Sequence, residues 1–192
     1  MSGGHGHGHA EGEGSNKTIA LLISVLALFL AFSETLGKSA QTDAISRNVE
    51  ASNLWAFFQA KTIRITSLRS ATATAEIMGA ASPGLKDSEP FRKHMDDWAK
   101  TIPRWDSEPE TGEGRRELAS RAKAAETQRD TSLARYHHYE VGSAAFQIGI
   151  VLASAMLITG IAALAWLAAG LGVVGVIMVL IGLFAPHSVH LI

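Results

Sequence analysis

The sequence contains no cysteine among its 192 residues. This absence excludes disulfide bonds, thiolate metal sites and a cysteine nucleophile, although it does not identify a cellular compartment. The sequence also lacks a glycine-rich phosphate loop, a nucleophile elbow and a zinc-protease helix motif. We therefore expect a protein that is not an enzyme and that holds no tightly bound cofactor.

Charged residues are missing from long parts of the chain. From Val141 to Ile192 there is no Asp, Glu, Lys or Arg, and a second apolar stretch covers Ile19 to Phe32. About 20 mostly apolar residues span a hydrocarbon core of roughly 30 Å, so the C-terminal stretch is long enough to cross a bilayer twice. The sequence therefore predicts an integral membrane protein. Its spans hold no ionisable residue beyond Glu34 at an edge. This argues against a monomeric ion-coupled transporter and leaves a pore formed by an oligomer open.

The hydrophobic pattern sets the predicted boundaries. In order, they are a disordered Gly/His-rich tail over 1–17, a transmembrane helix over 18–36, a helical polar region over 37–140, a second transmembrane helix over 141–167, a third over 171–186 and a C-terminal tail over 187–192. The run Ala-Ala-Gly-Leu-Gly over 168–172 predicts the turn between the last two spans. No Lys or Arg precedes Lys17, so the first apolar stretch resembles a retained anchor more than a cleaved signal peptide.

The polar region predicts a helical hairpin. Lys38 to Ala80 contains no proline and carries apolar residues every three or four positions, so it predicts one long helix that ends at Ser82-Pro83-Gly84. A short helix is expected over 87–101 with Ser88 as N-cap, then a loop over 102–114 and a second long helix over 115–140. The second helix has a stripe of mostly small residues, which suits close antiparallel packing against the bulkier first helix.

The predicted fold class is therefore an all-α membrane protein with three transmembrane helices and a long polar, coiled-coil-like hairpin between the first and second. Basic residues flank the membrane side of this hairpin, with Lys38 and Arg47 after the first span and Arg129 and Arg135 before the second. The positive-inside rule then places 37–140 in the cytoplasm.

The run Leu54-Trp55-Ala56-Phe57-Phe58 holds more large apolar groups than one helix face requires. Either several partners surround it, or it lies against the membrane surface. We expect a non-enzymatic scaffold or accessory protein that forms a homo-oligomer or joins another membrane complex. The predicted contact residues are Leu54, Trp55, Phe57, Phe58, Ile65 and Leu68. The balance of 17 basic against 18 acidic residues gives no indication of nucleic acid.

Histidines supply the alternative hypothesis, a metal- or pH-responsive oligomeric channel or sensor. His5, His7 and His9 alternate along the tail, so an extended chain would direct three imidazoles toward one transition metal ion. A solvated tail is the other interpretation, because a flexible site binds weakly. His137-His138 and His187 with His190 are expected on the same side of the membrane, and at most one of the first pair could join a cluster there.

The segment from Asn16 to Thr42, together with Glu50-Ala51-Ser52-Asn53-Leu54-Trp55 and the following Ala56-Phe57-Phe58-Gln59-Ala60-Lys61, resembles a family of bacterial membrane proteins catalogued as domain of unknown function 4337. The order of polar helices followed by two apolar spans is similar too. The resemblance implies a bacterial inner membrane and a native His-rich tail. It implies no activity, cofactor or site residue.

Overall fold

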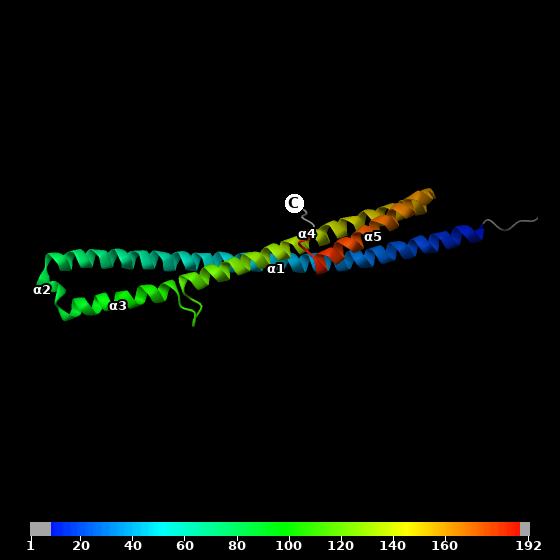
Figure 1. The fold of residues 1–192 in the computed structure, drawn as a ribbon. Helices are drawn as coiled ribbons and strands as arrows, with labels where there is room; N and C mark the ends of the chain where they lie inside the picture. Colours follow the sequence, from blue (N-terminus) through cyan, green and yellow to red (C-terminus); the bar gives the residue numbers. More distant parts are fainter. Residues whose placement is uncertain (1–8, 189–192) are drawn as a thin grey trace, which may run out of the picture. The chain divides into compact units, whose positions relative to one another are not determined.

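The computed structural model describes residues 9–188, with side chains described from Asn16 onward, and this part of the chain contains helices and no strand (Figure 1). The helices are α1 over His9–Ala81, α2 over Pro83–Lys86, α3 over Glu89–Asp106, α4 over Arg115–Thr159 and α5 over Ala162–Phe184. Three of them, α1, α4 and α5, are long and apolar enough to cross a membrane. The predicted all-α class with three candidate spans is confirmed.

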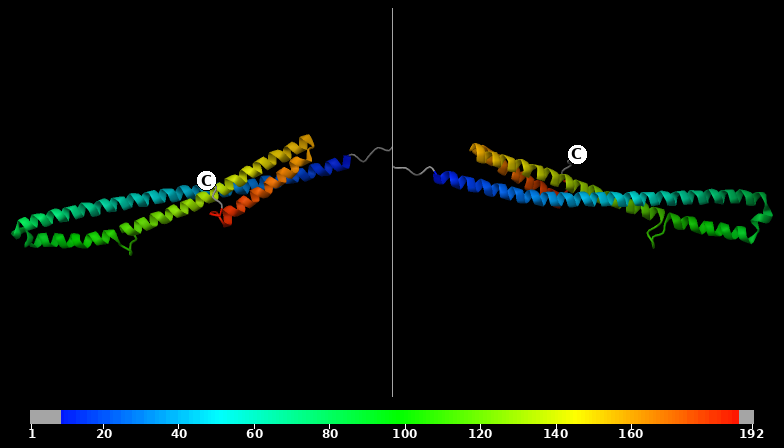
Figure 2. Two further views of the ribbon diagram at one scale, coloured as in Figure 1. Left: turned by 45° about the horizontal axis from the view of Figure 1, so that its top comes forward. Right: turned by 180° about the vertical axis from the view of Figure 1, so that it is seen from behind.

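The chain divides into two compact units. The first, the membrane unit, comprises 1–44 and 130–192, and the second, the hairpin unit, comprises Ile45–Arg129. In the membrane unit α4 and α5 run side by side in every view (Figure 2). Ile19 of α1, Ala153 of α4 and Ala168 of α5 form one buried cluster, so all three helices share a core.

Glycines bring α5 close to its neighbours in the membrane unit. A Cβ atom added to Gly175 would lie 2.6 Å from the Phe146 ring of α4, and one added to Gly172 would lie 2.7 Å from Leu26 of α1. Phe146 is fully buried and stacks on Phe29, with ring centroids 5.8 Å apart. Lipid supplies no hydrophobic drive for helix association, so close contact between small and large residues has to stabilise this core.

The turn between the last two spans differs from the prediction. The chain reverses at Gly160, which has φ +75°, and residues 168–172 lie inside α5. Glycine adopts this left-handed conformation without a Cβ clash. Ala168 and Gly172 are buried helix contacts, so the predicted turn over 168–172 is wrong because these small residues serve packing. With 23 residues at about 1.5 Å each, α5 is long enough to span.

The N-terminal boundary also differs. Helix α1 begins at His9, so residues 9–17 are helical where the sequence predicted a disordered tail. A helix that already exists extends without a new nucleation step, which favours continuation from the first span. Residues 1–8 lie outside the described part of the chain.

In the hairpin unit, α1 ends at Ala81 and α3 begins after Ser88, as predicted. Helix α3 continues to Asp106, however, so the loop starts at Ser107 rather than at 102. The helix extends this far because α3 carries its own apolar stripe at 4-3 spacing. The members of this stripe are all partly buried: Phe91, Met95, Trp98, Ile102 and Trp105. Trp98 and Trp105 lie on this face before and after Pro103, so the helix continues past the proline. Phe91 lies against Gly79 of α1, where an added Cβ would be 3.0 Å from the ring.

Candidate functional site

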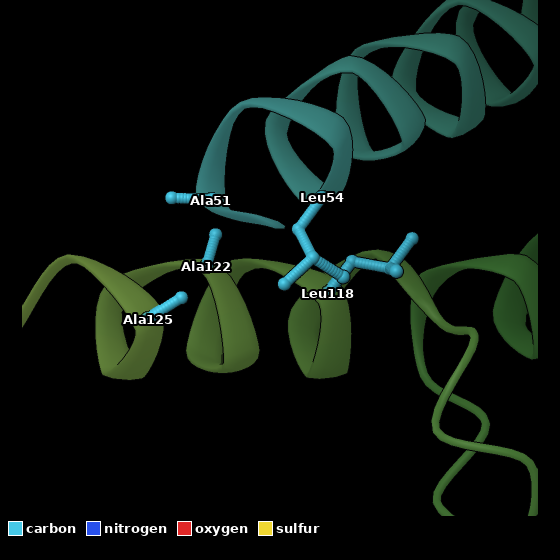
Figure 3. Close-up of a cluster of buried hydrophobic side chains, with 5 residues drawn as sticks. All are labelled: Ala51, Leu54, Leu118, Ala122 and Ala125. Carbon is cyan, nitrogen blue, oxygen red and sulfur yellow. The ribbon is translucent and has the colours of Figure 1, made fainter. Parts of the chain in front are cut away.

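The hairpin unit has a core in which bulky residues of α1 meet small residues of α4. Ala51 and Leu54 of α1 pack on Leu118, Ala122 and Ala125 of α4 (Figure 3). Leu118 and Ala122 are completely buried. The predicted pairing of a bulky stripe with a small-residue stripe is therefore present.

Trp55 and Phe58 complete this core from its edge. Their rings meet edge to face with centroids 5.3 Å apart, and the Trp55 indole Nε1 donates a hydrogen bond to the Glu126 carboxylate at 2.9 Å. Because the indole N–H has a partner across the hairpin, Trp55 is satisfied within the chain.

The six residues predicted to contact a partner are mostly covered within the chain. Leu54 and Ile65 are buried, and Trp55, Phe58 and Leu68 are half-buried. Phe57 alone among the six is exposed, at 39%, and its ring lies 5.8 Å from the ammonium of Lys61. These residues therefore do not provide the excess apolar surface on which the sequence argument depended.

A different face of α1 carries that surface. We call it the outer seam, because its positions alternate by four and three residues along α1 and every one is exposed. Its members are Ile45, Val49, Ser52, Ala56, Gln59, Ile63, Thr66, Ser70, Ala73 and Ile77. The large members are strongly exposed, for example Ile63 at 66% and Ile77 at 72%. No member is charged, although this part of α1 contains Arg47, Glu50, Lys61, Arg64, Arg69 and Glu76.

Sequence reasoning missed the outer seam because the aromatic residues at 55–58 dominated the pattern. The signal was available: Ile45 and Val49 begin a 3.5-residue repeat that continues through Ile63 to Ile77. Only the burial of the other face by α4 shows which of the two repeats is left without a partner in the chain.

The loop between α3 and α4 is held by a network that we call the loop clasp. The Asp106 carboxylate pairs with Arg115 at 2.6 Å and with Arg116 at 2.9 Å. The Glu117 carboxylate accepts hydrogen bonds from the Ser107 hydroxyl at 2.7 Å and from the backbone N–H of Glu108 at 3.1 Å. The clasp fixes the end of α3 and the start of the loop to the first turn of α4, where an acidic side chain also suits the helix dipole.

The loop clasp should weaken in acid. The hydrogen bonds from Ser107 and then from Glu108 lower the pKa of Glu117 below its ordinary value near 4.5. A lowered folded-state pKa means that the stabilisation is complete above the unfolded value and is lost as pH falls through the folded value. We expect the protection factors of amides 107–117, which are exchange rates corrected for the intrinsic pH dependence of exchange, to be constant above about pH 5 and to fall below it.

The Glu117→Gln variant provides the control for this pH effect. Its amide cannot ionise, so we expect protection factors that are lower at neutral pH and show no acid-dependent step. A wild-type acid step that persists in Glu117→Gln would assign the effect to another carboxyl group.

The structure places the predicted histidines in different settings. His138 is buried and its Nε2 lies 3.1 Å from the Pro186 carbonyl oxygen, so Nε2 carries the hydrogen and donates it. His187 Nε2 lies 3.1 Å from the Thr131 hydroxyl. One histidine of the 137–138 pair therefore meets the segment after α5, and this contact ties that segment to α4.

No group of three or more His, Asp or Glu residues within the described residues is arranged to hold a metal ion. His5 and His7 lie outside these residues, as does His190, and His9 is the first residue of α1 with no described side chain. The metal hypothesis for the tail stays a prediction.

Comparison with known proteins assigns a family. The family described as domain of unknown function 4337 matches residues 15–185, so the chain belongs to it. No curated protein and no solved structure matches the chain.

Proposed function

We propose that this member of the domain of unknown function 4337 family is a non-enzymatic membrane scaffold or accessory protein that assembles with a second copy of itself through the outer seam. The observation that carries the proposal is a 4-3 repeat on α1 that is exposed at all ten positions, apolar at six and charged at none. Coiled coils form when apolar residues recur every 3.5 residues on one helix face.

The composition of the outer seam suits close pairing of helices. Large residues at Ile45, Val49, Ile63 and Ile77 alternate with short stretches of Ser, Ala and Thr. Large residues remove apolar area from water, at about 25 cal/mol per Å², while small residues let two backbones approach. A charged residue at a seam position would oppose such packing, and the seam has none.

A second copy is the partner that best fits this face. Membrane anchoring gives every copy the same orientation, so a twofold axis along the membrane normal brings two outer seams together in parallel. Residue i then meets residue i of the other copy, with Ile63 against Ile63 and Gln59 against Gln59. A polar layer whose side chains can hydrogen-bond across the axis favours one register, and Gln59, the only amide in the seam, would take that role.

The proposed location is the inner membrane of a bacterium, with residues 37–140 in the cytoplasm. Lys38 and Arg47 on α1 and Arg129 and Arg135 on α4 support this orientation, because basic residues concentrate on the cytoplasmic side of membrane spans. A cytoplasmic hairpin paired through its outer seam would present α3 and the loop clasp to other proteins.

Disulfide trapping tests the proposal directly, because the chain contains no other cysteine. We expect Ile63→Cys, oxidised in native membranes, to form a cross-linked dimer across the twofold axis. Arg47→Cys is the matched control: Arg47 is exposed on the same helix but lies off the outer seam, so it should stay monomeric on a denaturing gel.

Native mass spectrometry of Ile63→Glu gives an independent measurement. Two carboxylates facing each other at the seam should weaken dimerisation about tenfold or more, whereas Arg47→Glu should not. A monomeric wild-type protein in lipid, together with no cross-link at Ile63→Cys, would rule out the homo-oligomer. A fixed ratio with another protein would instead identify an accessory subunit.

A further inference from the structure

The membrane unit contains a hollow of about 340 Å³ between α1 and α4, which we call the interfacial hollow. Its polar lining comes from Ser33, Glu34, Lys38 and Gln41 on α1 and from Tyr136, Tyr139, Glu140 and Ser143 on α4. Nothing in the proposed scaffold function uses it.

The position of the hollow along the helices is informative. On α1 it begins directly after the apolar run Ile19 to Phe32, in which Leu28, at 57%, and Phe32, at 60%, are exposed. On α4 it reaches Ser143, two residues into the uncharged stretch from Val141. A hollow at this level opens at the headgroup layer of a bilayer, directly beside surface that acyl chains would cover.

The charges of the hollow select a zwitterion. Lys38 contributes one cation, and Glu34 and Glu140 contribute two carboxylates. Among the described residues Lys38 has no carboxylate within ion-pair distance, so its ammonium is available to a phosphate. The net lining charge of about −1 disfavours an anionic lipid, whereas a ligand with both a phosphate and an ammonium satisfies both signs.

The two carboxylates are oriented by neighbouring donors. The Gln147 amide donates to Glu34 Oε1 at 3.3 Å, and the Tyr136 hydroxyl donates to Glu140 Oε1 at 3.4 Å. Each carboxylate oxygen can accept more than one hydrogen bond, so both groups keep capacity for a ligand. The other titratable groups nearby are the imidazole of His137, 3.8 Å from Glu140 Oε2, the phenols of Tyr136 and Tyr139, and the guanidinium of Arg135.

From this geometry we infer that the interfacial hollow binds the headgroup of an ethanolamine phospholipid, with Lys38 on the phosphate and Glu34 and Glu140 on the primary ammonium. A primary ammonium carries three N–H donors for carboxylates, by analogy with lysine. The quaternary ammonium of a choline lipid has none, so the hollow discriminates between two zwitterions of the same charge.

Native mass spectrometry of the full chain, delipidated in detergent and then offered defined lipids, tests the inference. The expected result is retention of phosphatidylethanolamine about tenfold better than phosphatidylcholine or phosphatidylglycerol of the same acyl chains. Glu34→Gln combined with Glu140→Gln should abolish the preference for ethanolamine over choline. Lys38→Gln should weaken retention of both zwitterions, because it removes the phosphate partner.

Arg135→Gln is the matched control, since Arg135 is an exposed cation on α4 beside the hollow but does not line it. It should retain wild-type selectivity. Competition by soluble glycerophosphoethanolamine, which keeps the phosphodiester and the primary ammonium of the lipid, separates a headgroup site that needs no acyl chains from one that requires the membrane lipid. Equal retention of the three lipids by the wild-type protein would overturn the inference, whatever the variants do.

Discussion

Replacing Gly175 with leucine is expected to separate α5 from α4 and to lower the stability of the membrane unit by about 1–3 kcal/mol. The first added carbon alone would lie 2.6 Å from Phe146, a side chain that is fully buried and already stacked on Phe29. Unfolding in mixed micelles with increasing SDS, followed by loss of helical circular dichroism, measures this change.

The same helix supplies a matched control. Gly170 also lies in α5, but an added Cβ there would have no neighbour within 4 Å. Gly170→Leu should therefore leave the unfolding midpoint unchanged or raise it slightly, since leucine favours a helix more than glycine does. Equal destabilisation by both substitutions would show that α5 does not pack on Phe146.

A double variant tests the assigned contact further. Phe146→Ala alone should destabilise the unit by about 3–5 kcal/mol through the cavity that it leaves. In Gly175→Leu/Phe146→Ala the new side chain occupies part of that cavity, so the combined loss should be smaller than the sum of the two single losses. Simple additivity would contradict direct contact.

Leu118→Ala is expected to open the hairpin unit, with a loss of about 2–5 kcal/mol. Leu118 is completely buried against Ala51 and Leu54, and its removal leaves a cavity at the centre of the only buried cluster that the structure describes between α1 and α4 in this unit. Faster hydrogen exchange over 51–58 and 115–125 would report the opening, and the loop over 107–114 should become sensitive to protease.

The control is a leucine-to-alanine substitution at an exposed position of α4. Leu133 is 38% exposed, so Leu133→Ala should change stability by about 0.5 kcal/mol or less and leave exchange in the hairpin unit unaltered. Hairpin exchange that stays slow in Leu118→Ala would mean that contacts outside this apolar cluster hold α4 to α1.

Much of the architecture was predictable because hydrophobic length and helical periodicity are local properties. The missing charges after Val141 and the apolar run from Ile19 indicated membrane spans, and Pro83 and Ser88 marked the end of α1 and the start of α3. Each of these signals acts on the residues that carry it, so no tertiary contact was needed to interpret it.

The misplaced turn between the last two spans has a specific physical cause. Glycine has two uses, as a turn residue and as a site of close helix packing, and composition does not distinguish them. Gly160 forms the turn with a positive φ, while Gly172 lies in a helix against Leu26. The turn was predicted at 168–172, around Gly172, because glycine and alanine are more frequent there than around Gly160.

By itself the sequence determined the helical class, the number of candidate spans and the pairing of a bulky stripe with a small one, since these follow from residue size and spacing. The tertiary structure alone decided which apolar face of α1 is used up within the chain. Two repeats lie on that helix, one through Leu54 and Ile65 and one through Ile45 and Ile63, and both satisfy the same periodicity. The repeat through Leu54 and Ile65 is buried against the rest of the chain, and the repeat through Ile45 and Ile63 is left exposed. Which repeat is buried depends on the helix that packs against α1, and the sequence of α1 alone does not reveal it.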